Sequence, residues 1–500
     1  MLNKKIKNIF VKNLPLVLLI PLSLKILVSV FISYYTYDVA KVISYLVDSN
    51  SLSDYINSLR FGIAICVQMY GLSQVVDLNV QIIKFGSYIF FMGTFLVTIN
   101  TFIGRKKTLL IKSFFLVLSC SVFFFSDTLT FLGSYGMLVY CQGFFMGAIL
   151  LYLALDEFNF FLRSKPSRYW IYYFFFITLA CFIDIRFSLY LCITFLGLLF
   201  VNIGKVKRQL RYLFFGVPSG VICLFFVYYQ FISLPHLKNF RPAHVEKYLY
   251  NEGANFYKIV VFIFERMGDL AGTLVGDIIF IKLSFVILCV LGAINIWHKG
   301  QKLPVLILTL SLLTLIFTSL INAYPFGSIR YCTTLLSFFI YFFLEGLHVC
   351  HNKINLTSRK IYFTMPIALI AVIFIFSDAY EIYKERIEKF NKEKKIEESL
   401  MSASKTSKIY CDIVAEKIVK AYGVKCIVLT TWNTTKDLGE EEGFYNKVVS
   451  GMRRDNTLYL YLWKPISNVH FKELEELMNR EGLRRQGSIK GHHFFYKYTR

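Results

Sequence analysis

Long apolar segments constrain the fold of this chain more than any other feature. Runs of about 18 or more apolar residues are typical of helices that cross a membrane. The first run, 14–36, follows a lysine-rich N-terminus and has no small-residue cleavage site behind it, which predicts an uncleaved signal anchor. Further runs lie at 79–102, 109–126, 137–156, 169–186, 187–203, 212–232, 279–297, 303–322, 331–349 and 361–380. We therefore expect a polytopic α-helical membrane protein.

The links between these runs alternate in charge, and this alternation predicts an orientation. The short basic links are 104–107, 163–168, 204–211, 298–302 and 350–360. The links that are long or poor in Lys and Arg are 37–78, 126–136, 233–278 and 322–330. Because Lys and Arg favour cytoplasmic loops, the pattern predicts about eleven spans, with the N-terminus inside and the C-terminus outside. The stretch 169–203 enters this scheme as two spans, divided at CFIDIRF.

The composition changes after Tyr380, where a strongly charged helix is expected. Alternating and β-rich stretches then predict strands at VKCIVLTTW (buried) and TLYLYLW, and SIKGHHFFYKYT resembles an edge hairpin. Helices are expected at KIYCDIVAEKIVKAYG, GFYNKVVSGM and NVHFKELEELMNREG. We therefore divide the chain into a membrane domain, 1–380, and a segment 381–500 that holds the charged helix and a small exoplasmic α/β domain.

Cysteine and motif content exclude several classes of function. Of the 11 cysteines, Cys411 and Cys426 fall in the exported domain, where either a disulfide or two reduced core thiols fits the sequence. The cluster His348, Cys350 and His351 lacks a fourth ligand, so no metal site is predicted. No phosphate-binding, dinucleotide-binding or nucleophile-elbow motif is present. The net charge of +23 is spread over many loops, so we expect no nucleic-acid partner.

Ionisable residues at the predicted outer rim are the remaining candidates for function. Arg330 lies in the stretch INAYPFGSIRYC, on the side where the charge rule predicts few basic residues. Asp38 follows the first span, and Asp127 follows the third. Asp184 and Arg186 lie at the break after the fifth. Because charges near membrane depth are costly, such residues are functional candidates.

Three stretches resemble the GT-C glycosyltransferases, which take sugars from polyprenyl-phosphate carriers, and in particular the bacterial relatives of protein O-mannosyltransferases. The first is YYTYDVAKVISYL, in which an acid directly follows the first span and opens a long outer loop with amphipathic helices. The others are SDTLTFLGSYGMLVYCQGFF and YPFGSIRYCTTLLSFF, which looks like a late "YP-x-x-R" helix entry. Asp38 departs from the family in being followed by Val, and the Arg-Pro-Tyr character of the second outer loop is missing.

Sugar transfer from a lipid phosphate to a hydroxyl requires a base for the acceptor and cations for the phosphate. Asp38 is the expected general base, and an N-cap or loop acid is the structural alternative. Arg330 is the expected phosphate ligand with Lys84 as its partner, although a lysine there also fits snorkelling and an arginine there also fits lipid headgroups. Arg186 either joins them or pairs with Asp184. Asp127 is the reserve acid or metal-binding group, and the sequence does not decide whether a divalent metal is the cofactor.

The expected partners are a lipid-linked sugar donor, a glycan, lipid or protein acceptor, and the cell membrane. Three other classes stay open: an O-antigen-type polysaccharide polymerase, a flippase or transporter of lipid-linked glycans, and a non-enzymatic anchor for the C-terminal domain. A transporter would be expected to show internal repeats, and none is evident. Lys25, in the middle of the first run, has no assigned partner. The sugar, the acceptor and the linkage are not predicted.

Overall fold

We analysed a computed structural model of the 500-residue chain. The structure describes 37–59, 63–76, 78–104, 138–162, 248–250, 255–275, 279–321, 326–327, 332–353, 387–428, 457–462, 468–480, 482–490 and 494–500, with a few isolated positions. The helices of the membrane-type part are α5 (Val80–Gly104), α8 (Leu138–Leu162), α14 (Phe256–Val275), α15 (Ile279–His298), α16 (Lys302–Leu320), the 3₁₀-helix η3 (Thr333–Leu335) and α18 (Leu336–Lys353). The predicted spans at 14–36, 109–126, 169–186, 187–203, 212–232 and 361–380 lie outside, or almost wholly outside, the described residues.

Two compact units divide the chain, and they are not simply its two halves. The first contains 1–27, 61–65 and 85–378, and the second contains 28–60, 66–84 and 379–500. The helices that follow the first apolar run therefore belong with the C-terminal residues. A boundary close to residue 380 also separates the C-terminal segment from the apolar helices before it.

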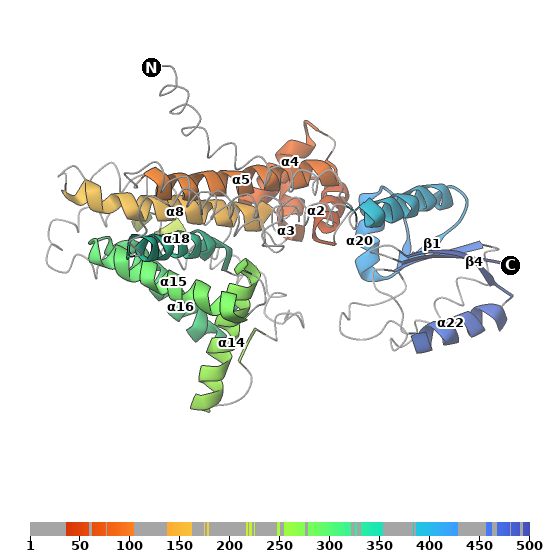
Figure 1. Cartoon of the computed structure of the whole chain (residues 1–500). Helices are drawn as coiled ribbons and strands as arrows, with labels where there is room; N and C mark the ends of the chain where they lie inside the picture. The colour runs from red at the N-terminus through yellow and green to blue at the C-terminus, as the bar shows by residue number, and fades with distance from the viewer. Residues whose placement is uncertain are drawn as a thin grey trace, which may run out of the picture. The chain divides into compact units, whose positions relative to one another are not determined.

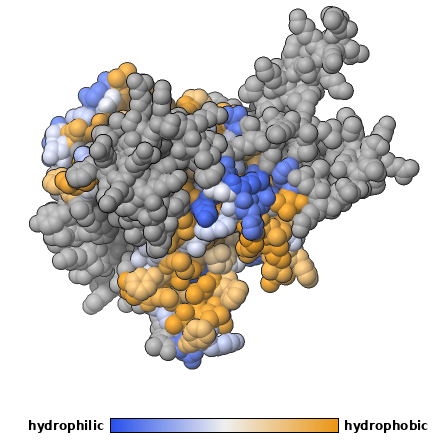
Figure 2. All heavy atoms as spheres, turned by 90° about the vertical axis from the view of Figure 1, so that its left-hand side faces the viewer, coloured by the Kyte–Doolittle hydropathy of each residue, from blue (hydrophilic) through white to orange (hydrophobic). Residues whose placement is uncertain are grey.

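Apolar helices dominate the first unit, in agreement with the sequence. Within the described residues, three helices are long and apolar enough to cross a membrane: Val80–Phe102, Lys302–Leu320 and Thr333–Cys350. Two shorter apolar helices are Tyr140–Leu155 and Lys282–His298. Figure 2 shows apolar side chains gathered over much of the lower part of the face that it presents. The predicted membrane-type helical region is confirmed at this level, and the number and direction of the spans stay predictions.

Glycines hold α15 and α18 in close backbone contact (Figure 1). A Cβ on Gly292 of α15 would overlap the carbonyl of Phe342, and a Cβ on Gly346 of α18 would overlap the carbonyl of Leu288. Small residues let membrane helices approach closely, and van der Waals packing then replaces the hydrophobic effect as the source of stability. This reciprocal pair fixes the position of α18 against α15.

Aromatic side chains join α5, α8 and α18. The ring of Phe91 on α5 lies 5.8 Å from that of Phe144 on α8, and Phe102 contacts Tyr341 of α18 at 6.1 Å, edge to face. A Cβ on Gly147 of α8 would overlap the carbonyl of Thr334 in η3. Edge-to-face and offset rings are the arrangements that aromatic quadrupoles favour. These contacts place the start of α18 against α8.

Short helices follow the first apolar run; the first two are amphipathic, as predicted, whereas the helix Ile63–Ser73 is apolar around its whole circumference. They are α2 (Tyr37–Asp48), α3 (Leu52–Leu59) and α4 (Ile63–Ser73). Ser51 caps α3: its hydroxyl accepts a hydrogen bond from the Asp54 amide at 3.2 Å and donates one to the Asp54 carboxylate at 2.8 Å. This exchange resembles a capping box. The buried Tyr55 hydroxyl donates to the Val42 carbonyl at 3.3 Å, so α3 packs back on α2.

The C-terminal residues form a five-stranded mixed sheet of order β2-β1-β3-β5-β4. Its strands are β1 (Ile409–Cys411), β2 (Ile427–Val428), β3 (Thr457–Leu462), β4 (Arg484–Lys490) and β5 (Phe494–Thr499), with helices α20 (Ile413–Ala421) and α22 (Asn468–Arg480). β1 pairs in parallel with β2 and β3, whereas β5 pairs antiparallel with β3 and β4. Figure 1 shows α22 on one face of the sheet and the helical segment 387–404 on the other.

The alternation of side chains along β3 explains why helices cover both faces of the sheet. Leu458, Leu460 and Leu462 point into the core under α22, while Tyr461 is buried on the opposite face. A side-chain period of two sends neighbours to opposite faces, so a strand that is apolar at both sets of positions needs cover on both. The predicted strand TLYLYLW, the predicted helix NVHFKELEELMNREG and the predicted hairpin are confirmed.

The sequence expectation for VKCIVLTTW was wrong in one respect. The described strand here, β2, is two residues long, and Ile427 is 43% exposed rather than buried. The reason is its place: among the described strands, β2 lies at the edge of the sheet and pairs with β1. The helix expected at KIYCDIVAEKIVKAYG was wrong at its start, because Ile409–Cys411 form strand β1 and the helix α20 begins at Ile413. The predicted helix GFYNKVVSGM lies outside the described residues.

Cys411 and Cys426 form a disulfide, which resolves the alternative that the sequence left open. It links the end of β1 to the residue that precedes β2, across α20. Asp412 caps α20 by accepting a hydrogen bond from the Ala415 amide at 2.8 Å, and Gly423 ends the turn after it with φ 72°. Left-handed φ is open to glycine without steric cost, so the β1–α20–β2 unit is fixed at both helix ends.

Candidate functional site

Of the five predicted site residues, the structure describes the side chain of one. Lys84 lies in the first turns of α5 and is buried, with 5% of its surface exposed. Asp38 is the second residue of α2, where the backbone is described and the side chain is not. Asp127, Arg186 and Arg330 lie outside the described residues. The predicted convergence of these groups is therefore neither shown nor contradicted.

Two residues of the stretch that leads to Arg330, Phe326 and Gly327, are described, and both are tightly held. The amide of Phe326 donates to the Tyr248 carbonyl at 3.2 Å. The Ser319 hydroxyl at the end of α16 donates to the same carbonyl at 2.7 Å, and the Tyr250 amide donates to the Ser319 carbonyl at 3.2 Å. Two segments far apart in the sequence are thus joined at the end of α16. Phe326 is therefore held against Tyr248 by a backbone hydrogen bond.

Arg266 of α14 completes this turn, and the sequence reading did not single it out. A Cβ on Gly327, whose φ is 97°, would crowd the Arg266 side chain, so only glycine allows this approach. The guanidinium lies over the rings of Tyr248, at 5.5 Å, and Phe262, at 5.6 Å, and pairs with Asp269. Its buried Nε has no hydrogen-bond partner among the described residues. A charged FERMGD stretch within an apolar helix was the signal that could have found it.

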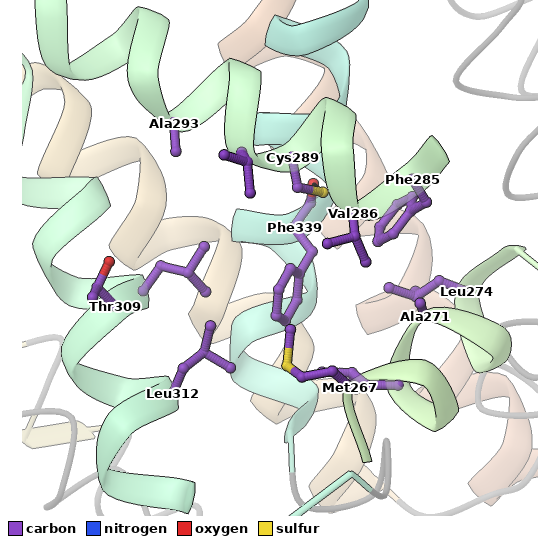
Figure 3. Close-up of a pocket in the computed structure, with 13 residues that line it drawn as sticks. Met267, Ala271, Leu274, Phe285, Val286, Cys289, Ala293, Thr309, Leu312 and Phe339 are labelled. Carbon is purple, nitrogen blue, oxygen red and sulfur yellow. Dashed lines mark hydrogen bonds between the residues drawn. The ribbon is translucent and has the colours of Figure 1, made fainter. Parts of the chain in front are cut away.

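An apolar cavity of about 170 Å³ lies between α14, α15, α16 and α18 (Figure 3). Its wall on α14 is formed by Met267, Leu270, Ala271 and Leu274, which directly follow Arg266. Phe339 of α18 contributes its ring. The Cys289 thiol donates to the Phe339 carbonyl at 3.4 Å, so this polar group is satisfied. The cavity is suited to hydrocarbon rather than to a polar ligand.

A buried charged cluster lies near the middle of α18. Glu345 is 1% exposed, and its carboxylate accepts hydrogen bonds from Asn295 at 3.0 Å, Lys299 at 3.1 Å and the Tyr341 hydroxyl at 3.4 Å. A buried carboxylate is tolerated when it is paired and hydrogen-bonded. The cluster joins α15 to α18, and Glu345 lies fifteen residues along the chain from Arg330. We therefore infer that it stabilises the contact between these two helices.

The helix that carries Asp38 is anchored in the second unit. Lys420 of α20 pairs with Asp48 at 3.1 Å, and the Lys417 ammonium lies 4.7 Å from the centre of the Tyr45 ring. Burial by itself lowers the pKa of Lys420, but hydrogen bonds to Asp48 and Glu416 outweigh it, so the pKa lies above its ordinary value. The α2 helix therefore packs on the C-terminal α/β part through charged and aromatic contacts.

No protein-family model matches the chain, and a search of curated proteins gives no significant match. The class of protein consequently rests on the fold: a mostly helical chain with membrane-type helices and a small C-terminal sheet. Among the described residues, no group of three or more His, Cys, Asp or Glu side chains could hold a metal ion.

Proposed function

We propose that this chain is a polytopic membrane glycosyltransferase that moves a sugar from a polyprenyl-phosphate carrier to an acceptor hydroxyl at the outer face of the cell membrane. Asp38 takes the acceptor proton as general base. Arg330, with Lys84 and Arg186, binds the carrier phosphate, and Asp127 serves as a second acid. About eleven spans, with the C-terminal domain outside the cytoplasm, belong to this proposal.

The observation that carries the proposal is the braced turn before Arg330. Hydrogen bonds to Tyr248 and the close approach of Gly327 to Arg266 hold the chain three residues before the arginine. A phosphate ligand needs such preorganisation, because a bidentate guanidinium must be aimed as well as charged. An arginine that only touched lipid headgroups would need no fixed turn behind it.

The contact between α2 and α20 supports the proposed topology. These helices pack together, so the first loop and the C-terminal domain lie on one side of any membrane that the chain crosses. The charge rule assigns both to the outside independently. A reporter fused after Asp378 is expected to be exported, and one fused after Lys107 is expected to be cytoplasmic. A cytoplasmic C-terminal domain would overturn the proposal.

Transfer assays with a polyprenyl-phosphate sugar in detergent test the chemistry. Asp38→Asn keeps the shape and removes the base, so the rate is expected to fall by about 10²–10⁴-fold. Asp48→Asn, on the same helix, is the matched control and should retain the parental rate. Equal rates for the parent and Asp38→Asn would show that Asp38 is not the base.

Donor binding tests the role of Arg330. Arg330→Lys keeps the charge but loses the two-pronged hydrogen bonding, and Arg330→Ala loses both, so donor affinity should fall in that order. A charge-assisted hydrogen bond to an anion is worth about 1.5–3 kcal/mol. Arg484→Lys, an exposed position on β4, is the control. Equal donor affinity in all forms would place the phosphate site elsewhere.

A further inference from the structure

The two sulfur atoms of the C-terminal disulfide lie in different environments. Cys411 is fully buried in β1, which lies between β2 and β3 in the order of the sheet. Cys426 directly precedes the edge strand β2 and is only partly buried, and its neighbours Lys425 and Ile427 are both exposed. Thiol–disulfide exchange requires a thiolate to reach one of the two sulfur atoms. An attacking thiolate therefore has access to this bond from the Cys426 side.

In the described part of the sheet, β2 is held by few contacts besides the disulfide. It pairs with β1 at two positions, Tyr410–Ile427 and Cys411–Val428. A short strand with one neighbour opens locally at a lower free energy than a strand in the centre of a sheet. Such an opening exposes Cys426 further, so the bond can react while the rest of the domain stays folded.

The disulfide closes a loop that contains one helix, α20. The inner side of α20 packs on the strands, and Ala415, Ile418 and Val419 are fully buried there. The bond fixes both the point where the chain leaves β1 and the point where it returns to β2. A cross-link of this kind restricts the conformations that the closed loop can adopt. Breaking it therefore allows α20 to move away from the sheet.

The outer side of α20 contacts α2. Lys420 pairs with Asp48 at 3.1 Å, and the Lys417 ammonium lies 4.7 Å from the centre of the Tyr45 ring. Lys417 and Lys420 are three positions apart, so they lie on one face of α20, and the same holds for Tyr45 and Asp48 on α2. Both helices belong to the second unit. A displacement of α20 is therefore transmitted directly to α2.

We propose that the Cys411–Cys426 disulfide is a site of thiol–disulfide exchange with a dithiol, either a small molecule or a protein, and that its reduction loosens α20 and, through α20, α2. A thiolate of the dithiol attacks the Cys426 sulfur, and the Cys411 sulfur leaves with the electron pair of the broken bond and takes up a proton. The exposed Lys425 favours the approach of the thiolate.

The second thiol of the dithiol completes the reaction. As a thiolate it attacks its own partner sulfur in the mixed disulfide, and the Cys426 sulfur leaves and is protonated. The dithiol is thereby oxidised to a disulfide, and the two cysteines gain two electrons and two protons. This inference concerns the second unit and does not depend on sugar transfer.

A monothiol identifies the sulfur that is attacked. The full chain in lipid nanodiscs is incubated with excess reduced glutathione and quenched with acid and N-ethylmaleimide, and its peptides are mapped by mass spectrometry. We expect glutathione on Cys426 and maleimide on Cys411, because the buried sulfur is the leaving group. Glutathione on Cys411 would overturn the proposed site, and so would a bond that reacts only in denaturant concentrations that unfold the sheet.

Hydrogen exchange with and without dithiothreitol tests the loosening of α20. We expect reduction to raise exchange in α20 by about tenfold or more, because losing a cross-link commonly shifts an opening equilibrium by at least that factor. Exchange in α22, which packs on the leucines of β3, should rise less. The double variant Cys411→Ser and Cys426→Ser should match the reduced parent and ignore dithiothreitol. An equal rise in α20 and α22 would show that the bond only stabilises the whole domain, and would overturn the inference.

A second variant tests whether α20 acts on α2. Lys417→Ala combined with Lys420→Ala removes the two side-chain contacts between these helices. Reduction should raise exchange in α2 several-fold in the parent and by less than about twofold in this variant, while α20 responds in both. Lys405→Ala, at an exposed position outside both helices, is the matched control and should behave like the parent. An α2 that ignores reduction in the parent, or responds equally in the double variant, would contradict the coupling.

Discussion

The α15–α18 pair and the C-terminal sheet are both well packed, but they achieve this by opposite means. The α15–α18 contact depends on two glycines, which have no side chains and so let the two backbones touch. The sheet depends on what is present: leucines and tyrosines from β3 that fill both faces, closed by a disulfide at β1. In the membrane arrangement that we propose, their solvents explain the difference, because lipid gives apolar side chains no reason to associate, whereas water does.

The comparison teaches where each part tolerates change. A larger residue is harmful at a glycine contact, while a smaller residue is harmful in the sheet core. The polar groups differ in the same way. Glu345 needs Lys299, Asn295 and Tyr341 around it to be buried in the helical unit, whereas the Lys420–Asp48 pair of the second unit is partly exposed.

The largest expected effect is at the glycine contact. Gly346→Val would drive a branched side chain into the Leu288 carbonyl, so we expect little folded protein in detergent. Gly346→Ala should unfold at lower temperature, with a cost of about 1–3 kcal/mol from overpacking. Gly268→Ala is the matched helical control, because a Cβ there meets nothing within 4 Å. Thermal unfolding followed by circular dichroism measures all three, and equal midpoints would show that α15 and α18 are not held by this contact.

The disulfide should have the next largest effect, confined to the second unit. Replacing Cys411 and Cys426 by serine removes a cross-link that closes a short loop, which typically costs about 2–4 kcal/mol. Hydrogen exchange should rise in the sheet and stay unchanged in α15 and α18. A mass that does not change on reduction and alkylation at these two positions would contradict the bond. Replacing the buried Cys289 by serine is the control, since that thiol is not cross-linked.

The smallest expected effect concerns the Lys420–Asp48 pair. Both groups are partly exposed, so Asp48→Asn should cost only about 0.2–1 kcal/mol.

The pH dependence of the Lys420–Asp48 contribution to stability has a definite sign. Because the folded-state pKa of Lys420 is raised, its contribution is complete below about pH 10.4, the unfolded value, and is lost as the pH rises through the folded value. Hydrogen exchange of α2 measured against pH checks this, and Asp48→Asn should remove the alkaline step. The exposed Glu388→Gln, next to Lys392, should leave α2 unchanged.

Much of the fold could be predicted because its signals are local. The apolar runs at 79–102, 137–156, 279–297, 303–322 and 331–349 became α5, α8, α15, α16 and α18. Length and composition suffice for this, since a spanning segment must satisfy its own backbone hydrogen bonds. Strand β3 and helix α22 followed from side-chain periodicity. The burial of the strand at VKCIVLTTW was predicted wrongly, because whether a strand lies at the edge or the centre of a sheet depends on the whole sheet and not on the segment itself.

The candidate site could be predicted only as a set of residue types. Asp38 and Arg330 stood out because a charge next to an apolar run is visible in the sequence. Arg266 did not stand out, because its importance depends on Gly327, which is sixty-one positions away. The apolar cavity is equally non-local: each of its residues would look like ordinary helix interior on its own.

The sequence by itself determined the class of this chain: apolar helices, a charged connection and a small C-terminal α/β part. Each follows from a property of neighbouring residues, namely hydropathy, charge or period. Only the tertiary structure decided that α2 belongs with the C-terminal sheet, that Cys411 bonds to Cys426, and that Gly292 and Gly346 meet. The physical reason is that these contacts join distant segments, and their free energy depends on distances that no local pattern encodes.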